Sequence, residues 1–501
     1  MTLSEHMQNI LSVSNQDWIN LFSIFVGMVI VIGLGEMLRK KLRLSPEVTR
    51  KFVHISIGVL VVFATKIFVS IVPPLILGLV FITVNLVAIR MGLLTGMHDT
   101  SRKSYGTVYY PVAFVLLVVL FWFDHPAIIS ISMLVLAFGD AGAAILGENL
   151  HSPTIYRLTT DKKSIEGSTI MLVVSFLCLF LGIRFLWGTD VAVRESLVIA
   201  AVGAVVATAW EAISSQGFDN LSVPISVAFI LFYYLVPTPL AHPDQFSIGI
   251  GLSLLIAVLS WYFAFLTASG SVATFLLASI IYGIGGWKWT LPILTFFVLS
   301  SLLSKVGRKR KMQFDSVFEK SSRRDYAQVG ANGGIAGIII VLQFLFPSLN
   351  LYAIYLGSVA AVTADTWGTE IGLLKNFPTY SMTKLRQVSQ GSNGGVSVAG
   401  LAGGFLGSLV TTSSAYFWIQ GISTLLLIST AGFLACLVDS ILGDTLQVSF
   451  QCQVCSKITE KKTHCTAQTR YVSGVHWMDN DRVNWICAIS GAAFAVLAFL
   501  A

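Results

Sequence analysis

Charged residues are scarce in this sequence. Lys, Arg, Asp and Glu together make up 11% of its 501 residues, whereas a typical soluble domain carries about 25%. The mean hydropathy is +0.78, so the chain has too few charged groups to cover its apolar residues with a water-facing surface. A water-soluble globular protein and a disordered chain are therefore excluded.

Cysteine is also rare, with six residues in the whole chain, which excludes a small disulfide scaffold. No glycine is followed directly by lysine, so the chain has no phosphate-binding loop of the Gly-Lys-Ser/Thr type and cannot be a soluble P-loop kinase. The net charge of +7 is the only feature that would suggest nucleic-acid binding, and we expect no nucleic-acid partner.

Long apolar runs are abundant instead. Sixteen runs are candidates for membrane spans, and several are shorter than the usual ~20 residues, so we predict 14 to 16 spans in an all-α, polytopic transmembrane protein. Of the 32 basic residues, 28 lie in alternate loops. By the positive-inside rule this predicts that the large loops are cytoplasmic and that both termini lie outside.

The chain is predicted to consist of two membrane domains in tandem, residues 1–240 and 246–501. The break contains Pro237, Pro239 and Pro243. Acidic residues recur in the two halves in the same order and at similar spacing. This suggests an ancient duplication or a fusion of two related enzymes, with coincidence as the alternative.

Three acidic residues of the first half lie in or beside apolar runs, where a carboxylate is costly and usually functional. Asp140 is surrounded by small residues, while Glu211 and Asp219 flank a short loop without basic residues. Together they could hold Mg²⁺, which prefers carboxylate and phosphate oxygens. Purely structural partners for these acids are the alternative.

Basic and small polar residues of the same half predict a phosphate-binding region. His54 shares a helix face with Arg50 and is a candidate general base, with a packed core histidine as the alternative. Lys163 precedes a span whose first backbone N–H groups favour anions, although simple capping by Ser164 and Glu166 would look the same. The candidate phosphate contacts are Arg50, Lys51, Arg102, Lys103, Lys163, Ser164, Glu166, Gly167 and Ser168.

The second half carries a comparable set. Asp365 is the candidate catalytic residue, and the candidate magnesium ligands are Asp365, Glu370, Asp439 and Asp444. The candidate phosphate contacts are Arg324, Gln328, Asn332 and the glycine-rich loop Gly391, Ser392, Asn393 and Gly394. Such groups suit a nucleotide or diphosphate bridged by Mg²⁺. A structural polar network and the central site of a transporter are the alternatives.

Four potential metal ligands lie in the last large loop: Cys452, Cys455, His464 and Cys465. A disulfide is not expected in a reducing cytoplasm. The group could hold zinc, although an adjacent His-Cys pair is unusual for a zinc site.

Residues 35–236 resemble the phytol kinase and dolichol/polyprenol kinase family. The matching motifs are Arg50-Lys51-x2-His54-x3-Gly58, Gly106-Thr107-x2-Tyr110-Pro111, Gly139-Asp140-Ala141, Lys163-Ser164-x-Glu166-Gly167-Ser168 and Glu211…Asp219-Asn220-x2-Val223-Pro224. The resemblance implies an integral membrane enzyme that phosphorylates the terminal hydroxyl of an isoprenoid alcohol, usually with CTP, although ATP remains open.

Residues 246–501 resemble a second membrane family, which includes the phytyl-phosphate kinase of tocopherol synthesis. The matching motifs are Leu266-x2-Ser269-Gly270, Gln328-Val329-x-Ala331-Asn332-Gly333-Gly334, Ala364-Asp365-Thr366-x2-Thr369-Glu370, Gly391-x-Asn393-Gly394-Gly395, Asp439-Ser440-x2-Gly443 and the Cys452/Cys455/His464 region. The two resemblances imply one pathway, in which a prenol such as phytol, geranylgeraniol or farnesol becomes a monophosphate and then a diphosphate.

Two other functions fit the same composition. A transporter would also have many spans and intramembrane acids, but its site should lie at mid-membrane, whereas the acids here are expected at the cytoplasmic ends of spans. A CTP-dependent lipid cytidylyltransferase would use a similar nucleotide site and would leave cytidine on the lipid product.

Overall fold

The computed structural model describes residues 12–91, 105–149, 152–314, 317, 323–419 and 421–500. The chain divides into two compact units, Met1–Thr238 and Pro239–Ala501. The division falls between Pro237 and Pro239, two residues before the predicted end of the first half at residue 240.

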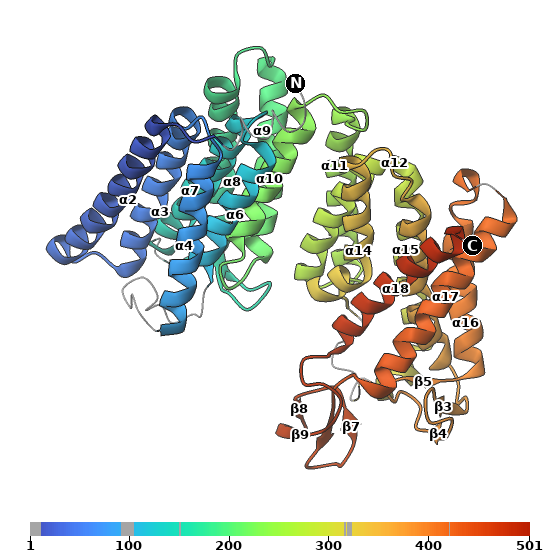
Figure 1. Cartoon of the computed structure of the whole chain (residues 1–501). Coiled ribbons are helices and arrows are strands. Elements are labelled where there is room, and N and C mark those ends of the chain that lie inside the picture. Colours follow the sequence, from blue (N-terminus) through green and yellow to red (C-terminus); the bar gives the residue numbers. More distant parts are fainter. Residues whose placement is uncertain are drawn as a thin grey trace. The chain divides into compact units, whose positions relative to one another are not determined.

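Unit 1 is built from helices and one short hairpin (Figure 1). Its helices are α2 (Asn15–Leu42), α3 (Pro46–Ile67), α4 (Val72–Met91), α6 (Gly106–Phe121), α7 (Pro126–Asn149), α8 (Ile165–Gly182), the π-helical turn η1 (Ile183–Trp187), α9 (Val193–Ile213) and α10 (Asp219–Leu235). The strands β1 (Ile155–Tyr156) and β2 (Lys163–Ser164) pair antiparallel between α7 and α8.

Helix α7 forms the centre of unit 1. It packs against α3, α8 and α10, and the side chains of Ile128, Ile129, Ile131 and Met133 are fully buried. Outer helices instead carry large exposed apolar side chains, for example Phe22 and Ile30 of α2. An apolar exterior around a buried helix is the arrangement expected in lipid.

Unit 2 has a second set of helices. They are α11 (Pro243–Tyr262), α12 (Ala268–Lys305), α13 (Arg308–Lys311), α14 (Tyr326–Leu345), α15 (Tyr352–Gly372), α16 (Val398–Ser413), α17 (Ile422–Thr445) and α18 (Asn480–Leu500), with the 3₁₀ turns η2 (Met312–Phe314) and η3 (Tyr416–Trp418). Two runs predicted as separate spans, 269–285 and 288–303, form α12. A kink at Gly286 separates them, where φ is +56°, a conformation that favours glycine.

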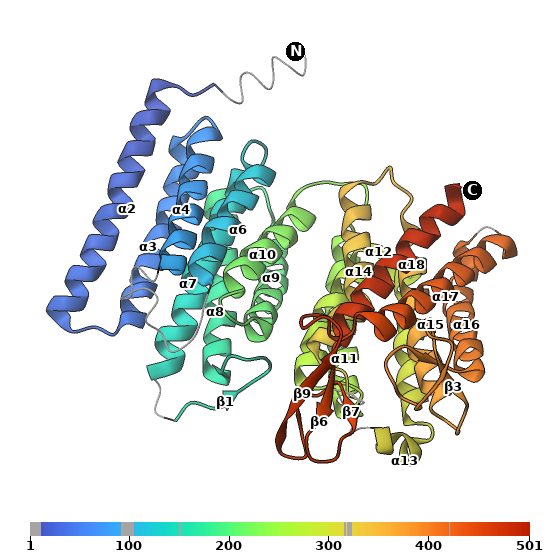
Figure 2. The same ribbon diagram turned by 60° about the horizontal axis from the view of Figure 1, so that its bottom comes forward.

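Two small antiparallel sheets lie at one end of the unit 2 helices (Figures 1 and 2). The first has the order β4-β3-β5, from β3 (Thr379–Ser381), β4 (Gln387–Val388) and β5 (Gly395–Val396). The second has the order β7-β6-β9-β8, from β6 (Ser449–Cys452), β7 (Ile458–Thr459), β8 (Thr463–His464) and β9 (Ala467–Ser473). In the sequence, the first sheet lies between α15 and α16, and the second lies between α17 and α18.

Ten helices of the described residues are long and apolar enough to cross a membrane, and α6, α10 and α16 are shorter apolar helices. Every predicted apolar run is helical in the structure. The prediction of an all-α, polytopic membrane protein is therefore confirmed.

Candidate functional site

Helices α3 and α7 bring together three side chains that lie far apart in the sequence. The ammonium Nζ of Lys51 lies 2.5 Å from Oδ2 of Asp140, and Nε2 of His54 lies 3.6 Å from the same oxygen. The helices approach closely because residue 58 is glycine: a Cβ there would lie 2.4 Å from that of Ala137. Lys51 and Asp140 are almost fully buried, with side-chain exposures of 6% and 15%.

A second ionic group joins β2, directly before α8, to the last turn of α9 and the first residue of α10. Nζ of Lys163 lies 2.5 Å from Oε1 of Glu211 and 3.4 Å from Oδ2 of Asp219. Burial alone would lower the pKa of Lys163. The carboxylates of Asp219 and Glu211 have the larger effect and hold this pKa above its ordinary range. Asp140 contributes to this effect, so the two ionic groups act on each other.

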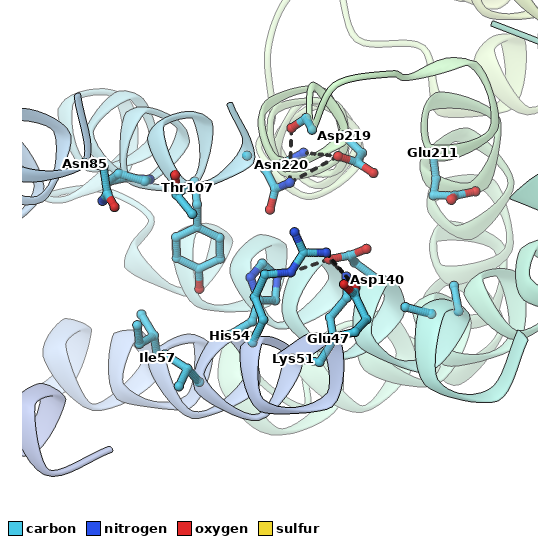
Figure 3. A pocket seen from close by; sticks show the side chains of 18 of the residues that line it. Glu47, Lys51, His54, Ile57, Asn85, Thr107, Asp140, Glu211, Asp219 and Asn220 are labelled. Carbon is cyan, nitrogen blue, oxygen red and sulfur yellow. Dashed lines mark hydrogen bonds and ion pairs between the residues drawn. The ribbon is translucent and has the colours of Figure 1, made fainter. Parts of the chain in front are cut away.

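Both groups line one cavity of about 830 Å³. Figure 3 shows Lys51, His54, Asp140, Glu211 and Asp219 around the same space. The rest of the wall is largely apolar and comes from α2, α3, α4 and α6. This volume lies within the range of about 300–1,000 Å³ that is usual for ligand sites.

Several buried polar atoms that face this cavity have no hydrogen-bond partner among the described residues. They are the hydroxyls of Thr107 and Tyr110, Nε2 of His54 and Oε2 of Glu211. Buried polar groups are normally satisfied. A cluster of exceptions on one cavity wall leaves donors and acceptors that a polar ligand or water can satisfy.

The carboxylates of Asp140, Glu211 and Asp219 fit a divalent cation. They share one cavity, they outnumber the two lysines that neutralise them, and an oxygen of Glu211 is unpartnered. Mg²⁺ usually takes only one or two protein carboxylates and keeps its other positions for phosphate and water. The donor set therefore suits a magnesium-bound nucleotide.

The predicted phosphate contacts of unit 1 divide into three groups. Arg50, which forms an ion pair with Glu47 at 2.6 Å, lines the cavity together with Lys51, Lys163, Ser164, Gly167 and Ser168. Glu166 instead accepts the backbone N–H of Thr154 at 3.0 Å and is not part of the described wall. Arg102 and Lys103 lie outside the described residues.

Helix capping fixes the start of α8. The side chain of Ser164 accepts the N–H of Gly167 at 3.0 Å, and the hydroxyls of Ser168 and Tyr156 lie 2.6 Å apart. Capping and cavity lining thus coexist at the same helix end.

In unit 2, the carboxyl groups of Asp365, on α15, and Asp439, on α17, lie close enough to interact directly. Both side chains are partly buried, and Oδ2 of Asp439 has no hydrogen-bond partner. No basic side chain of the described residues pairs with either acid. Two adjacent carboxylates without a counter-charge fit a cation as well as a shared proton.

The other predicted unit 2 residues are distributed over separate sites. Glu370 pairs with Lys311 at 2.5 Å, and Asp444 accepts hydrogen bonds from Ser381, at 2.6 Å, and from Thr383. Gly394 lies against Asp444, while Gly391, Ser392 and Asn393 belong to the same loop. The side chain of Asn393 donates to Ser449 at 3.3 Å.

Arg324, Gln328 and Asn332 line a different cavity, of about 80 Å³. Burial lowers the pKa of Arg324 to about 10, and Glu370 opposes the shift. The guanidinium lies over the ring of Phe296 at 5.1 Å. The wall of this cavity does not include Asp365 or Asp439, so the amides and the acid pair do not form one pocket in this structure.

Both units use the same local order around their central acids. In unit 1, Asp140 lies on the helix before the β1–β2 hairpin, and Glu211 lies on the second α-helix after it. In unit 2, Asp365 lies on the helix before the three-stranded sheet, and Asp439 lies on the second α-helix after it. The first helix after the hairpin or sheet has a serine cap, Ser164 or Ser397. The residue before the cap differs between the units: it is Lys163 in unit 1 and Val396 in unit 2.

The four predicted zinc ligands converge. One ligand atom from each of Cys452, Cys455, His464 and Cys465 lies within 4.8 Å of the other three.

Some cavity residues were not predicted as site residues, among them Asn85, Thr107, Tyr110 and Asn220. Asn85 is an isolated amide within an apolar run, and such polar residues in a span are a usable signal. Thr107, Tyr110 and Asn220 belong to motifs of the family resemblance but carry no charge that would single them out.

Comparisons with known proteins identify the family of this chain. Residues 251–492 match an integral membrane protein family, DUF92. The chain is 32% identical to Protein PGR of Arabidopsis thaliana over 263 residues, which cover 47% of this chain and 89% of that protein. The chain belongs to the DUF92 family.

This member of the DUF92 family is also similar to two further proteins. It is 33% identical over 214 residues to Phytol kinase of Synechocystis sp., covering 42% of this chain and 89% of that protein. Protein VTE6, chloroplastic, of Arabidopsis thaliana is 26% identical over 238 residues, covering 46% of this chain and 65% of that protein. No solved structure matches the chain. The predicted relationship to phytol kinases is confirmed, while the fusion of two kinases stays a prediction.

Proposed function

We propose that this protein is a membrane-embedded prenol kinase whose unit 1 transfers the γ-phosphoryl group of CTP to the terminal hydroxyl of an isoprenoid alcohol. The observation that carries the proposal is the unit 1 cavity, which joins a buried ionic cluster to an apolar wall. A phosphotransferase for lipids needs both parts in one site. The similarity to a protein named Phytol kinase supports the same chemistry.

The apolar part of the cavity follows α3 away from the ionic cluster. Its lining on this helix continues from His54 through Ile57 and Val61 to Ala64, a rise of about 15 Å at 1.5 Å per residue. Residues of α2 and α4 face the same stripe, including Met28, Leu77 and Phe81. An isoprenoid chain laid along this stripe would hold its hydroxyl beside His54.

The ionic part suits the triphosphate. Lys51 and Lys163 neutralise the carboxylates in the structure, and with nucleotide bound their N–H groups can turn to phosphate oxygens. Asp140, Glu211 and Asp219 would then hold Mg²⁺, which supplies charge neutralisation at the transferred group. The Nε2 atom of His54 has no hydrogen-bond partner and can accept the proton of the attacking hydroxyl.

We further propose that unit 2 phosphorylates the resulting monophosphate to the diphosphate. The paired carboxylates of Asp365 and Asp439 support a cation site there, because they meet without a counter-charge among the described residues of unit 2. Linking both steps in one chain would raise the local concentration of a lipid intermediate.

The positions of most of these charged residues along the helices support a kinase over a transporter, although Asp140 lies nine residues before the end of α7. Lys51 lies in the second turn of α3, Glu211 two residues before the end of α9, and Asp219 at the first residue of α10. A transport site is expected near the middle of broken helices. The positive-inside rule supports a cytoplasmic position for this face, where CTP is available.

The test is a labelled-nucleotide assay. Purified full-length protein is incubated with phytol or farnesol, Mg²⁺ and CTP or ATP carrying a label on the γ-phosphate, and the extracted lipids are separated. Label on lipid monophosphate and diphosphate is the expected result. Cytidine on the lipid would instead establish a cytidylyltransferase, and no turnover with any prenol would leave transport as the better explanation.

A further inference from the structure

The second sheet of unit 2 brings four metal-ligand side chains to one point. Nδ1 of His464 lies 3.5 Å from Sγ of Cys455 and 3.2 Å from Sγ of Cys465. All four ligand atoms, with Cys452 included, lie within 4.8 Å of one another. Atoms bound to a common zinc at about 2.0–2.3 Å must lie this close together.

The first hairpin holds its two cysteines in a compact turn. The backbone N–H groups of Val454 and Cys455 both donate to Sγ of Cys452, at 3.4 and 3.5 Å. Ser456, which follows, has a φ of +58°. Donors directed at a ligand sulfur stabilise its thiolate form, as neighbouring hydrogen bonds do in metal sites generally.

The second hairpin presents His464 and Cys465 from a two-residue turn. His464 pairs with Ala467, so Cys465 and Thr466 form the turn, with φ values of +51° and +61°. Turns of this shape normally use Asn or Gly, and a β-branched threonine at positive φ is uncommon. Such strain persists where the surrounding structure imposes it, and a metal held by both hairpins would do so.

From this geometry we infer that Cys452, Cys455, His464 and Cys465 bind one Zn²⁺ in a closed, structural site. Three thiolates and one imidazole form a complete tetrahedral ligand set. This soft set selects zinc over Mg²⁺, which takes oxygen ligands. Because the protein supplies all four ligands, no position remains for water or substrate, and the role is structural. This inference is independent of the proposed kinase function.

Few side chains of the sheet are buried. Its strands β7 and β8 have two residues each, and Val454, Ile458 and Tyr471 are exposed. A small sheet without a substantial core usually needs a further stabilising element. Zinc would connect the β6–β7 hairpin to the β8–β9 hairpin at the end distant from the helices.

The sheet is also attached to the part of unit 2 that carries the acids. The side chain of Gln447, two residues after α17, donates to Glu460 at 2.8 Å. The backbone N–H of Glu460 and the hydroxyl of Thr459 both donate to the carbonyl of Val317, at 2.9 and 2.8 Å. Zinc loss should therefore loosen these contacts beside the end of α17, without changing unit 1.

The experiment measures metal in the full-length protein, purified in detergent without chelator or affinity-tag histidines. Mass spectrometry of the metals should find one zinc per chain. The variants Cys452→Ser and His464→Ala should each lose it, whereas Cys178→Ser, which changes a cysteine in α8 of unit 1, should keep it. The variant His464→Cys offers a fourth thiolate and should also retain zinc.

A second readout separates binding from misfolding. Protein stripped with chelator and loaded with Co²⁺ should show the absorption bands of tetrahedral cobalt thiolate, and His464→Cys should shift them. Zinc-free protein that is folded, with three reactive thiols or a disulfide in this sheet, would overturn the inference. Iron in place of zinc in protein from zinc-replete cells would overturn the choice of metal.

Discussion

The side chains of Lys51 and Asp140 form a buried ion pair across 89 residues of sequence, with Nζ and Oδ2 separated by 2.5 Å. The pair joins α3 to α7 at the wall of the large cavity. Removing one partner of such a pair leaves the other charge buried and costs about 3–5 kcal/mol, whereas replacing both with apolar residues is often neutral. Stability and catalysis can therefore be separated at this position.

We predict that Asp140→Asn lowers formation of the lipid monophosphate by at least about 100-fold, because a carboxylate that neutralises charge at the phosphoryl group is lost. The melting temperature in detergent should also fall. The double variant Lys51→Met/Asp140→Leu should regain much of this stability but no activity. Recovery of turnover in the double variant would contradict a catalytic role for the pair, and Asp190→Asn, in an exposed loop, is the matched control.

Close helix packing gives a second prediction. Gly58→Ala places a methyl group 2.4 Å from Cβ of Ala137, so α3 and α7 must separate, at a typical cost of about 1–3 kcal/mol. His54 and Lys51 would move away from Asp140, and monophosphate formation should fall. The compensating variant Gly58→Ala/Ala137→Gly should restore both melting temperature and activity; if it restores neither, the close approach is not what positions the site.

The pH dependence of the first phosphorylation follows from Lys163. Its carboxylate neighbours hold the pKa of Lys163 above the ordinary value of 10.5. Because the folded pKa is raised, the ion pairs are fully present below the ordinary value and are lost only as the pH rises through the higher one. The rate should therefore show no alkaline decline from this group between pH 7 and 10.

Substitutions at Lys163 complete this test. Lys163→Arg keeps the charge and should give the same pH profile as the unsubstituted protein, while Lys163→Met should raise the KM for CTP and lower the rate by about 100-fold. A decline with a midpoint below pH 10 that disappears in Lys163→Arg would show that the lysine titrates in this range.

The helices were predictable from the sequence because lipid requires a long apolar run for every span. The two runs predicted on either side of Gly286 are two helical segments of α12, divided by the non-helical backbone at Gly286. Most predicted unit 1 site residues line one cavity because they lie near the ends of packed helices. Glu166 shows the limit: its orientation toward Thr154 depends on the intervening loop.

Unit 2 was harder to predict for the same reason. Asp444 looks like a metal ligand in the sequence, yet Ser381 and Thr383, about sixty residues earlier in the chain, satisfy it. Spacing along the chain gives no information about such long-range partners. The pairing of Asp365 with Asp439 likewise follows from the packing of α15 against α17, which neither helix reveals alone.

The apolar wall predicts a change of substrate preference. Ala64 lines the cavity ten residues beyond His54 on α3 and is 3% exposed. Ala64→Phe should fill the distant end and reduce kcat/KM for long prenols more than for short ones, with unchanged KM for CTP. Ala64→Val is the conservative control, and equal losses for phytol and for a short prenol would show that the tail does not lie along this stripe.

The two-unit proposal predicts opposite defects in two single variants. Asp140→Asn should abolish monophosphate formation but still convert supplied phytyl monophosphate to the diphosphate. Asp365→Asn should form the monophosphate and let it accumulate, because the acid pair with Asp439 is broken only in unit 2. Asp439→Asn should behave like Asp365→Asn, whereas Glu370→Gln, whose partner is Lys311, should have a weaker effect. If either Asp140→Asn or Asp365→Asn lost both activities while the purified protein remained folded at the assay temperature, the two reactions would share one site.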